Sequence, residues 1–286
     1  MEVNTRKPIY LFDLDGTLVI ENRAMPYAPE LIQFLNKNRR DFFIITNGAA
    51  LTSAQVACKL ENLNIRVAEK NIITSAQIMN NYLINHYMGK EFFFAGPGGI
   101  KNAFRESGLR ISENKPEAVV VSYDKSVSYD DIEKCIRFIA EGAHFLSTND
   151  DFYIPGERQY FPHTGLINFA ISSVTKKTPH IIGKPSRYFF EEVRKRTHTP
   201  KNNYCIVGDN VLTDIKFGEN CNISSVLVTT GVTQKDEIEK CLIKPDKIIG
   251  TLMELLETEN ETENENENEN ETGRIEKYVD YKKQKR

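Results

Sequence analysis

Short apolar runs alternate with segments of helical periodicity along most of this chain. One helix is predicted to begin at Thr52, three residues before Gln55, and another at Thr251, three residues before Glu254, because this spacing forms a capping box. Strands that alternate with helices predict an α/β fold with a Rossmann-like, largely parallel sheet and right-handed crossovers. The predicted strands span residues 9–12, 41–46, 91–96, 118–123, 144–148, 180–183, 204–208, 224–230 and 246–250.

The pattern is lost near the C-terminus. From Glu257 the sequence reads ETENETENENENENET, without apolar periodicity, and it ends in the basic run KKQKR. A segment that cannot bury apolar surface cannot offset its ordering entropy, so we expect residues 257–286 to form a disordered tail, first acidic and then basic. The tail carries ten acidic and six basic residues, which leaves a net charge of +1 on the rest of the chain. A body so close to neutral gives no electrostatic footprint for nucleic acid.

The cysteines and the apolar content bear on the compartment. Five cysteines are an odd number, they are widely spaced, and the chain has no CxxC motif. This argues against a disulfide framework or a zinc site and favours a reducing compartment. No apolar stretch approaches the length of a membrane span, and the sequence MEVNTRKP lacks the apolar region of a signal peptide. We therefore expect a cytoplasmic protein without a membrane partner.

Polar residues follow four of the predicted strands at the point where each strand ends. Asp13 follows the first, Thr46-Asn47-Gly48 the second, Lys184 the strand at 180–183, and Asp209 the strand at 204–208. In an open parallel sheet the carboxyl ends of the strands share one edge, where ligands bind. These segments, far apart in sequence, are therefore expected to converge on one pocket.

The pair Asp13 and Asp15 carries the chemistry of that pocket. Residues two apart on an extended chain lie on one face, and two carboxylates there need a cation between them, a proton on one of them, or exposure to solvent. Carboxylates favour Mg²⁺, while a lysine, a hydroxyl and backbone N–H groups can hold phosphate oxygens. One carboxylate can attack phosphorus, and its neighbour can carry the proton. This combination of carboxylates, a lysine, a hydroxyl and backbone N–H groups indicates phosphoryl transfer.

Four short motifs in order resemble those of the haloacid dehalogenase superfamily. They are DLDGT (13–17), TNG (46–48), GKPS (183–186) and GDNVLTD (208–214), and the resemblance covers about residues 8–256. The long interval between the second and third motifs has its own strands and helices, as in members with a large α/β cap. The segments TSAQIMNNYL, LSTNDD and VLVTTGVT resemble the NagD-like branch, which includes 4-nitrophenyl phosphatases, phosphoglycolate phosphatases, pyridoxal phosphate phosphatases and nucleotide monophosphatases.

The resemblance implies a role for each motif residue. Asp13 would be the nucleophile that becomes an aspartyl-phosphate, and Asp15 the general acid and base. Lys184 would neutralise the nucleophile and the phosphate oxygens. Dehalogenases of the superfamily usually lack the second aspartate, so Asp15 argues for a phosphatase. The phosphoryl group would be gripped by Thr46 with the backbone near Asn47 and Gly48, and Mg²⁺ would be held by Asp13, the backbone carbonyl of Asp15, Asp209 and Asp214, the last as a ligand or as support for the others.

The cap segments are expected to choose the substrate. Relatives often read TNPD or TNTD where this chain has TNDD (148–151), and GTG or CGA where it has HTG (163–165). Asp150 would disfavour a second anionic group on the substrate, whereas a protonated His163 could pair with one. The two pull in opposite directions, so phosphoglycolate, a sugar phosphate, pyridoxal phosphate, a nucleotide and 4-nitrophenyl phosphate all stay open.

Together these observations predict a catalytic core at residues 1–83 and 180–256, interrupted by a cap at residues 84–179. The predicted function is a Mg²⁺-dependent phosphatase that hydrolyses a small phosphomonoester through an aspartyl-phosphate. Two alternatives stay open: a phosphotransferase or mutase of the same superfamily, and a non-catalytic binding protein on this fold. The resemblance also implies a homodimer formed through the cap.

Overall fold

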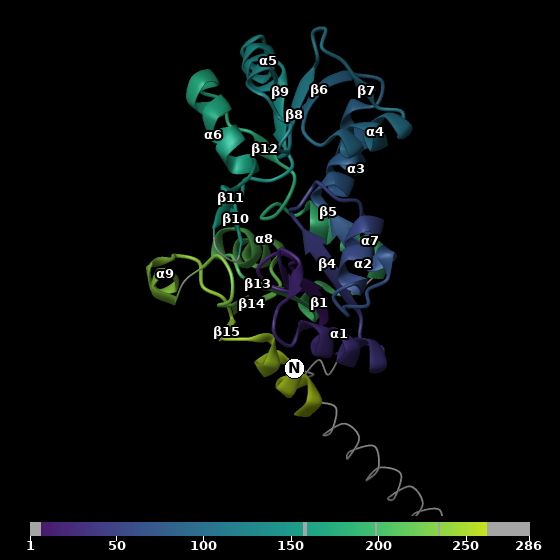
Figure 1. The fold of residues 1–286 in the computed structure, drawn as a ribbon, viewed down its shortest axis with the longest axis vertical. Helices are drawn as coiled ribbons and strands as arrows, with labels where there is room; N and C mark the ends of the chain where they lie inside the picture. The colour runs from purple at the N-terminus through teal and green to yellow at the C-terminus, as the bar shows by residue number, and fades with distance from the viewer. Residues whose placement is uncertain (1–6, 157–158, 198, 234, 262–286) are drawn as a thin grey trace, which may run out of the picture.

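A computed structural model describes residues 7–156, 159–197, 199–233 and 235–261 (Figure 1). Its first sheet has six strands in the order β15-β14-β13-β1-β4-β5, and every neighbouring pair is parallel. The predicted α/β fold with a parallel sheet is confirmed. The strands of this sheet are β1 (Ile9–Phe12), β4 (Phe42–Thr46), β5 (Ile72–Thr74), β13 (Tyr204–Gly208), β14 (Ser224–Val228) and β15 (Lys247–Ile249).

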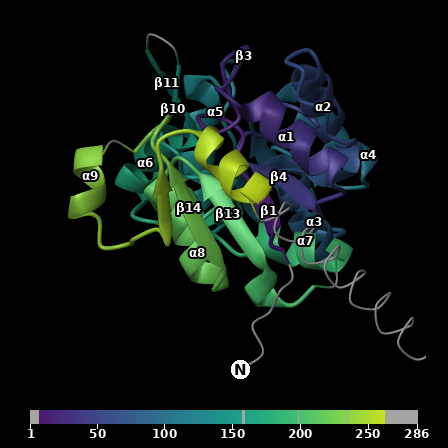
Figure 2. The same cartoon turned by 90° about the horizontal axis from the view of Figure 1, so that it is seen from below.

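Helices cover both faces of this sheet (Figure 2). Along β1, Ile9 and Leu11 belong to one apolar cluster with residues of α7 and α8, whereas Tyr10 and Phe12 belong to another with residues of α1 and α2. Burial on both faces explains why these strands read as continuous apolar runs. The elements around the sheet are α1 (Ala28–Lys37), α2 (Ser53–Glu61), η1 (Glu69–Asn71), α7 (Tyr188–Thr197), η2 (Lys201–Asn203), η3 (Val211–Ile215), α8 (Lys216–Cys221), α9 (Lys235–Lys240) and a helix over residues 252–261.

A second parallel sheet lies above the first in Figure 1 and has five strands in the order β12-β9-β8-β6-β7. Helices α5 and α6 pack on one of its faces and form a separate apolar cluster. Two antiparallel hairpins, β2 (Val19–Ile20) with β3 (Arg23–Ala24) and β10 (Tyr153–Pro155) with β11 (Tyr160–Pro162), complete the described strands. The second sheet and its helices are β6 (Glu91–Ala95), α4 (Gly98–Glu106), β7 (Arg110–Ile111), β8 (Ala118–Val121), α5 (Tyr129–Ala140), β9 (His144–Ser147), α6 (Thr164–Thr175) and β12 (His180–Ile181). Helix α3 (Ser75–Tyr87) precedes β6 in the chain and contacts β5 of the first sheet and the helix α7 beside it.

One predicted strand joins a different sheet from the one expected. The run at residues 180–183 was expected to end at the same sheet edge as the strand before Asp13. Instead β12 pairs with β9, so it belongs to the second sheet. An apolar run of this length carries no local signal that selects one parallel sheet over another. The exact limits of the predicted core and cap, at residues 83–84 and 179–180, stay a prediction.

The predicted tail begins later than expected. Residues 257–261 are helical, and Glu259 is only 5% exposed. Its carboxylate accepts a hydrogen bond from the Tyr10 hydroxyl at 2.6 Å and pairs with Arg40. The prediction of disorder is therefore wrong for residues 257–261. Both partners of Glu259 lie more than 200 positions away in the sequence, so no local pattern indicates these contacts. The remainder of the predicted tail, residues 262–286, lies outside the described residues.

Candidate active site

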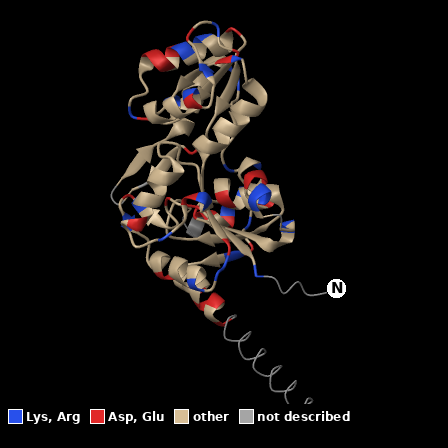
Figure 3. Cartoon of the chain, turned by 90° about the vertical axis from the view of Figure 1, so that its right-hand side faces the viewer, with Lys and Arg blue, Asp and Glu red and all other residues tan. Residues whose placement is uncertain are grey.

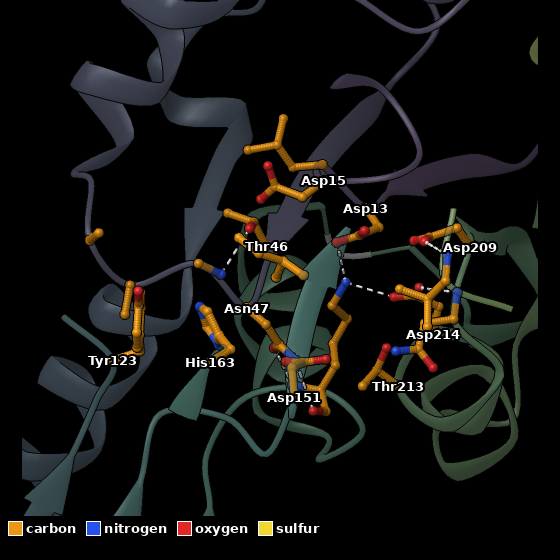
Figure 4. Close-up of a pocket in the computed structure, with 18 of the residues that line it drawn as sticks. Asp13, Asp15, Thr46, Asn47, Tyr123, Asp151, His163, Asp209, Thr213 and Asp214 are labelled. Atoms are coloured by element: carbon orange, nitrogen blue, oxygen red, sulfur yellow. Dashed lines mark hydrogen bonds and ion pairs between the residues drawn. The ribbon is translucent and has the colours of Figure 1, made fainter. Parts of the chain in front are cut away.

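The carboxyl ends of three core strands bring their polar side chains together (Figure 4). Asp13 directly follows β1, Thr46 is the last residue of β4, and Asp209 directly follows β13. The backbone N–H of Asp13 continues the pairing of the sheet by donating to the carbonyl of Val207 at 2.9 Å. All three side chains line a cavity of about 240 Å³. The convergence expected from the sequence is therefore present for these residues.

Lys184 lies at the centre of the site, although it arrives from the loop after β12. Its Nζ lies 2.6 Å from Oδ1 of Asp13 and 2.7 Å from Oδ1 of Asp214, and its side chain is 1% exposed. Burial alone would lower the pKa of this lysine, but the two carboxylates outweigh burial and the pKa is raised. Lys184 is therefore a permanently charged group that holds the nucleophile candidate in place.

Three buried carboxylates surround this single lysine. Asp13, Asp209 and Asp214 each offer one oxygen, and these oxygens lie within 4.8 Å of one another. Burial raises the pKa of all three, that of Asp214 to about 6, and the charge of Asp13 raises the pKa of Asp209 and of Asp214 further. The negative charges of these carboxylates outnumber the positive charge of Lys184, and carboxylate oxygens are hard donors. The cluster therefore suits a divalent cation such as Mg²⁺.

The backbone around this cluster is built to hold the carboxylates. Oδ2 of Asp209 accepts the N–H of Val232 at 2.6 Å, and Oδ2 of Asp214 accepts the N–H of Asn210 at 3.1 Å. Gly16 passes close beneath Asp209 with φ of +90°, and a Cβ on it would lie 2.7 Å from Cγ of Asp209. Only glycine can adopt that conformation and leave that space. The motif DLDGT therefore needs a glycine at position 16, because the chain there passes close to Asp209 of the motif GDNVLTD.

Asp15 lies on the Thr46 side of Asp13, away from Asp214 (Figure 4). Its Oδ1 is 4.0 Å from Nζ of Lys59, which lines the same cavity from α2. Burial raises the pKa of Asp15, while Lys59 and Lys184 oppose that rise. A carboxyl beside the nucleophile whose pKa is raised holds its proton more readily, which suits a group that gives and takes a proton.

The loop formed by Thr46, Asn47 and Gly48 is tied to two other segments. Oγ1 of Thr46 accepts the N–H of Gly48 at 2.9 Å. Oδ1 of Asn47 accepts the N–H of Lys184 at 2.8 Å, and Nδ2 donates to the Lys184 carbonyl at 3.1 Å and to Oδ2 of Asp151 at 2.8 Å. The sequence suggested Thr46 and the backbone near Asn47 and Gly48 for binding, and the structure adds the Asn47 side chain as a link.

The second sheet contributes Tyr123, Asp151 and His163 to the cavity. The structure places Asp150 elsewhere: its carboxylate accepts a hydrogen bond from Nδ2 of Asn168 at 2.9 Å, and the residue is exposed. Sequence reasoning named the segment 148–151 and chose Asp150 within it, whereas the adjacent Asp151 lines the cavity, and it did not name Tyr123. Neighbouring residues of an extended loop point to opposite sides, and no local pattern shows which side faces a partner.

His163 is held in an apolar setting. The residue is 7% exposed, and its ring lies 5.0 Å from that of Tyr123. Burial lowers the pKa of His163 to about 4, so the ring is neutral at pH 7. Burial therefore opposes the predicted pairing of a protonated His163 with a second anionic group.

Two family models match most of the core. A haloacid dehalogenase-like hydrolase model matches residues 10–110, and a HAD-hydrolase-like model matches residues 181–255. An acid sugar phosphatase of Staphylococcus saprophyticus is 31% identical over 249 residues, which cover 87% of this chain and 96% of the relative. The chain belongs to the haloacid dehalogenase-like hydrolases. The family predicted from the four motifs is confirmed.

Other members of this family agree with that assignment. The 5′-nucleotidase YutF of Bacillus subtilis is 31% identical over 86% of this chain and 96% of its own length. The solved 4-nitrophenylphosphatase of Thermotoga maritima superposes with a TM-score of 0.81, at 28% identity over 87% of this chain and 96% of that one. A glycerol phosphate phosphatase from Mycobacterium tuberculosis, solved with magnesium, has a TM-score of 0.78, at 26% identity over 86% of this chain and 75% of that one. The predicted enzyme class, a phosphatase, is confirmed.

Proposed function

We propose that this hydrolase is a Mg²⁺-dependent phosphatase that cleaves small phosphomonoesters through an aspartyl-phosphate on Asp13. The observation that carries the proposal is the pairing of Lys184 with Oδ1 of Asp13 at 2.6 Å inside the cavity that Asp15 also lines. With Lys184 paired at Oδ1, Oδ2 is the Asp13 oxygen that would attack phosphorus. The site thus offers a positioned nucleophile with a second carboxyl beside it.

The two carboxyls divide the chemistry between them. Asp13 would form the bond to phosphorus while the ester oxygen departs, and Asp15 would give that oxygen a proton. Asp15 would then take a proton from the water that attacks the aspartyl-phosphate and releases inorganic phosphate. Lys184 and the N–H groups of the Thr46–Gly48 loop would hold the phosphate oxygens during both steps.

The donor set suits Mg²⁺. Asp13, Asp209 and Asp214 would hold the ion together with the backbone carbonyl of Asp15, in line with their clustered oxygens. When bound, Mg²⁺ would offset the charges of the carboxylates and of the phosphate. The related glycerol phosphate phosphatase solved with magnesium supports this assignment.

The part of the cavity contributed by the second sheet favours an uncharged leaving group. His163 is neutral, and the Thr164 hydroxyl accepts the N–H of Tyr123 at 3.1 Å, so its proton can turn toward Nδ1 of His163 at 3.4 Å. Nε2 of His163 is then the N–H donor of the ring. A sugar or nucleoside hydroxyl can use such a donor beside the Tyr123 ring. The names of the sugar phosphatase and nucleotidase relatives point the same way.

A substrate panel tests this function. Purified protein is assayed with 4-nitrophenyl phosphate, glycerol phosphate, a nucleoside 5′-monophosphate and phosphoglycolate, with Mg²⁺ or with a chelator. We expect Mg²⁺-dependent release of phosphate and lower kcat/KM for phosphoglycolate, which carries a second anionic group. Transfer of the phosphoryl group to an added alcohol or sugar in place of water would favour the phosphotransferase alternative. Binding without turnover of any phosphomonoester would favour the non-catalytic one.

Three further expectations stay predictions: the cytoplasmic location, the homodimer through the cap, and the lack of a nucleic-acid partner. Figure 3 shows acidic and basic residues interspersed over the helices of both sheets. Within the part of the chain that the structure describes, no helix has the length and apolarity needed to cross a membrane.

A further inference from the structure

Asp151 occupies an unusual place between the two sheets. It lies in the loop after β9 of the second sheet, yet its Oδ2 lies 2.8 Å from Nδ2 of Asn47, which follows β4 of the first. The side chain also lines the cavity. We propose that Asp151 is a positioning residue that, through Asn47, holds the Thr46–Gly48 loop and the Lys184 segment in the geometry that grips phosphate. The proposal rests on the proposed phosphatase function.

Asn47 can transmit this effect because its whole side chain is engaged. Nδ2 has two protons, and they go to Asp151 and to the Lys184 carbonyl. Oδ1 accepts the backbone N–H of Lys184 at 2.8 Å. Removal of the Asp151 carboxylate would leave one proton of a buried amide without an acceptor, and the amide would rotate to find another. That rotation would break its contacts with Lys184.

The backbone of Asn47 is held as tightly as its side chain. Its carbonyl accepts hydrogen bonds from Nδ2 of Asn149 at 2.6 Å and from Oγ of Ser75 at 2.7 Å. Asn149 and Asp151 both belong to the loop after β9. One loop of the second sheet therefore binds both the side chain and the backbone carbonyl of Asn47, which follows a strand of the first sheet. The position of that loop and the shape of the phosphate grip are coupled by direct hydrogen bonds.

A direct role of Asp151 in binding the phosphoryl group is disfavoured by its charge. A carboxylate only accepts hydrogen bonds when ionised, and it would repel phosphate oxygens. The charged groups that influence it are Lys184, which favours its ionised form, and Asp214, which disfavours that form. Contact with the leaving group is the remaining alternative, and it predicts effects that depend on the substrate.

Two variants and a matched control separate these roles. Asp151→Ala removes the acceptor, Asp151→Asn keeps an oxygen acceptor without the charge, and Asp150→Ala removes the adjacent carboxylate that points to Asn168. For each protein, kcat and KM are measured with a series of phosphomonoesters at saturating Mg²⁺. Binding of inorganic phosphate is measured separately by calorimetry, and thermal unfolding checks the fold.

For Asp151→Ala we expect kcat/KM to fall about tenfold or more, by the same factor for every leaving group, as the loss of a hydrogen bond to a charged group implies. The dissociation constant of inorganic phosphate should rise by a similar factor. Asp151→Asn should recover most of both losses, and Asp150→Ala should match the wild type.

Three results would overturn the inference. In the first, Asp151→Ala binds inorganic phosphate as tightly as the wild type does. In the second, the loss of kcat/KM in Asp151→Ala varies with the leaving group while its phosphate affinity is unchanged. In the third, Asp151→Asn folds but does not recover kcat/KM and phosphate affinity. If Asp151→Ala does not fold, Asp151→Asn and Asn47→Ala carry the test through phosphate binding. Absence of turnover in the wild type would refute the proposed function, whereas phosphate binding that weakens in Asp151→Ala would still support the role of Asp151.

Discussion

The two sides of the cavity differ in charge and in how they are held. The edge of the six-stranded sheet supplies the buried carboxylates of Asp13, Asp209 and Asp214, and Lys184, which enters from the loop after β12, pairs with Asp13 and Asp214. The loops of the five-stranded sheet supply a neutral His163 beside Tyr123 and are connected to the first side by hydrogen bonds. A phosphate group has the same charge and shape in every phosphomonoester, whereas leaving groups vary. The charged side can therefore be general, and the neutral side can select.

The largest effect is expected at the nucleophile. Asp13→Asn keeps the shape of the side chain but removes the attacking charge, so turnover should fall by about three orders of magnitude or more for every substrate. Steady-state kinetics measures the loss, and circular dichroism checks that the fold persists. Appreciable turnover in a folded variant would rule out the covalent path through Asp13.

Asp15→Asn should also act from the charged side, but in a graded manner. The variant keeps the backbone carbonyl and loses the proton carrier, so turnover should fall by about 10²–10⁴-fold. Substrates with poor leaving groups should lose most, and 4-nitrophenyl phosphate least, because its leaving group needs little protonation. A leaving-group series at fixed pH measures the slope. Equal losses along the series would assign the acid role to another group.

His163→Ala tests the neutral side. We expect kcat/KM for a sugar phosphate and a nucleotide to change by about tenfold, as the loss of one hydrogen bond and of ring contacts implies. Hydrolysis of 4-nitrophenyl phosphate should change much less. The same panel on wild type and variant, at fixed Mg²⁺ and pH, makes the comparison. Parallel profiles would show that selection lies elsewhere.

The smallest expected effect is on stability. Burial raises the pKa of Asp151 and of Asp214 to about 6 from 3.8, so the folded state binds protons that the unfolded state has released. Without metal, this contribution to stability is present below about pH 4 and is lost as the pH rises to about 6.

A cation held by Asp13, Asp209 and Asp214 competes with protons for these carboxylates, so it should stabilise the protein more at high pH. We expect the rise in Tm on addition of Mg²⁺ to be larger at pH 7.5 than at pH 5, where protons compete for the same oxygens. Thermal unfolding with Mg²⁺ or with a chelator at each pH measures it, and Asp209→Asn should lose the rise at pH 7.5. An equal rise at both values would place the ion outside this cluster.

The sequence by itself determined the α/β fold and the charged side of the site. Asp13, Thr46 and Asp209 each follow an apolar run that forms a strand of one parallel sheet, and in such a sheet the strand ends meet at one edge. The capping box at Thr52 and Gln55 is present as expected. Signals of this kind lie within a few residues of the element that they specify, so they can be recognised without knowledge of the rest of the chain.

Only the tertiary structure decided the choices that depend on distant partners. It placed β12 in the second sheet, gave Asp151 rather than Asp150 to the cavity, and made His163 neutral by burial. It also extended the C-terminal helix to residue 261 through the contacts of Glu259. In each case the local sequence permits more than one arrangement of similar free energy. Desolvation and hydrogen bonds to residues far along the chain select one of them, and neither is encoded in a local pattern.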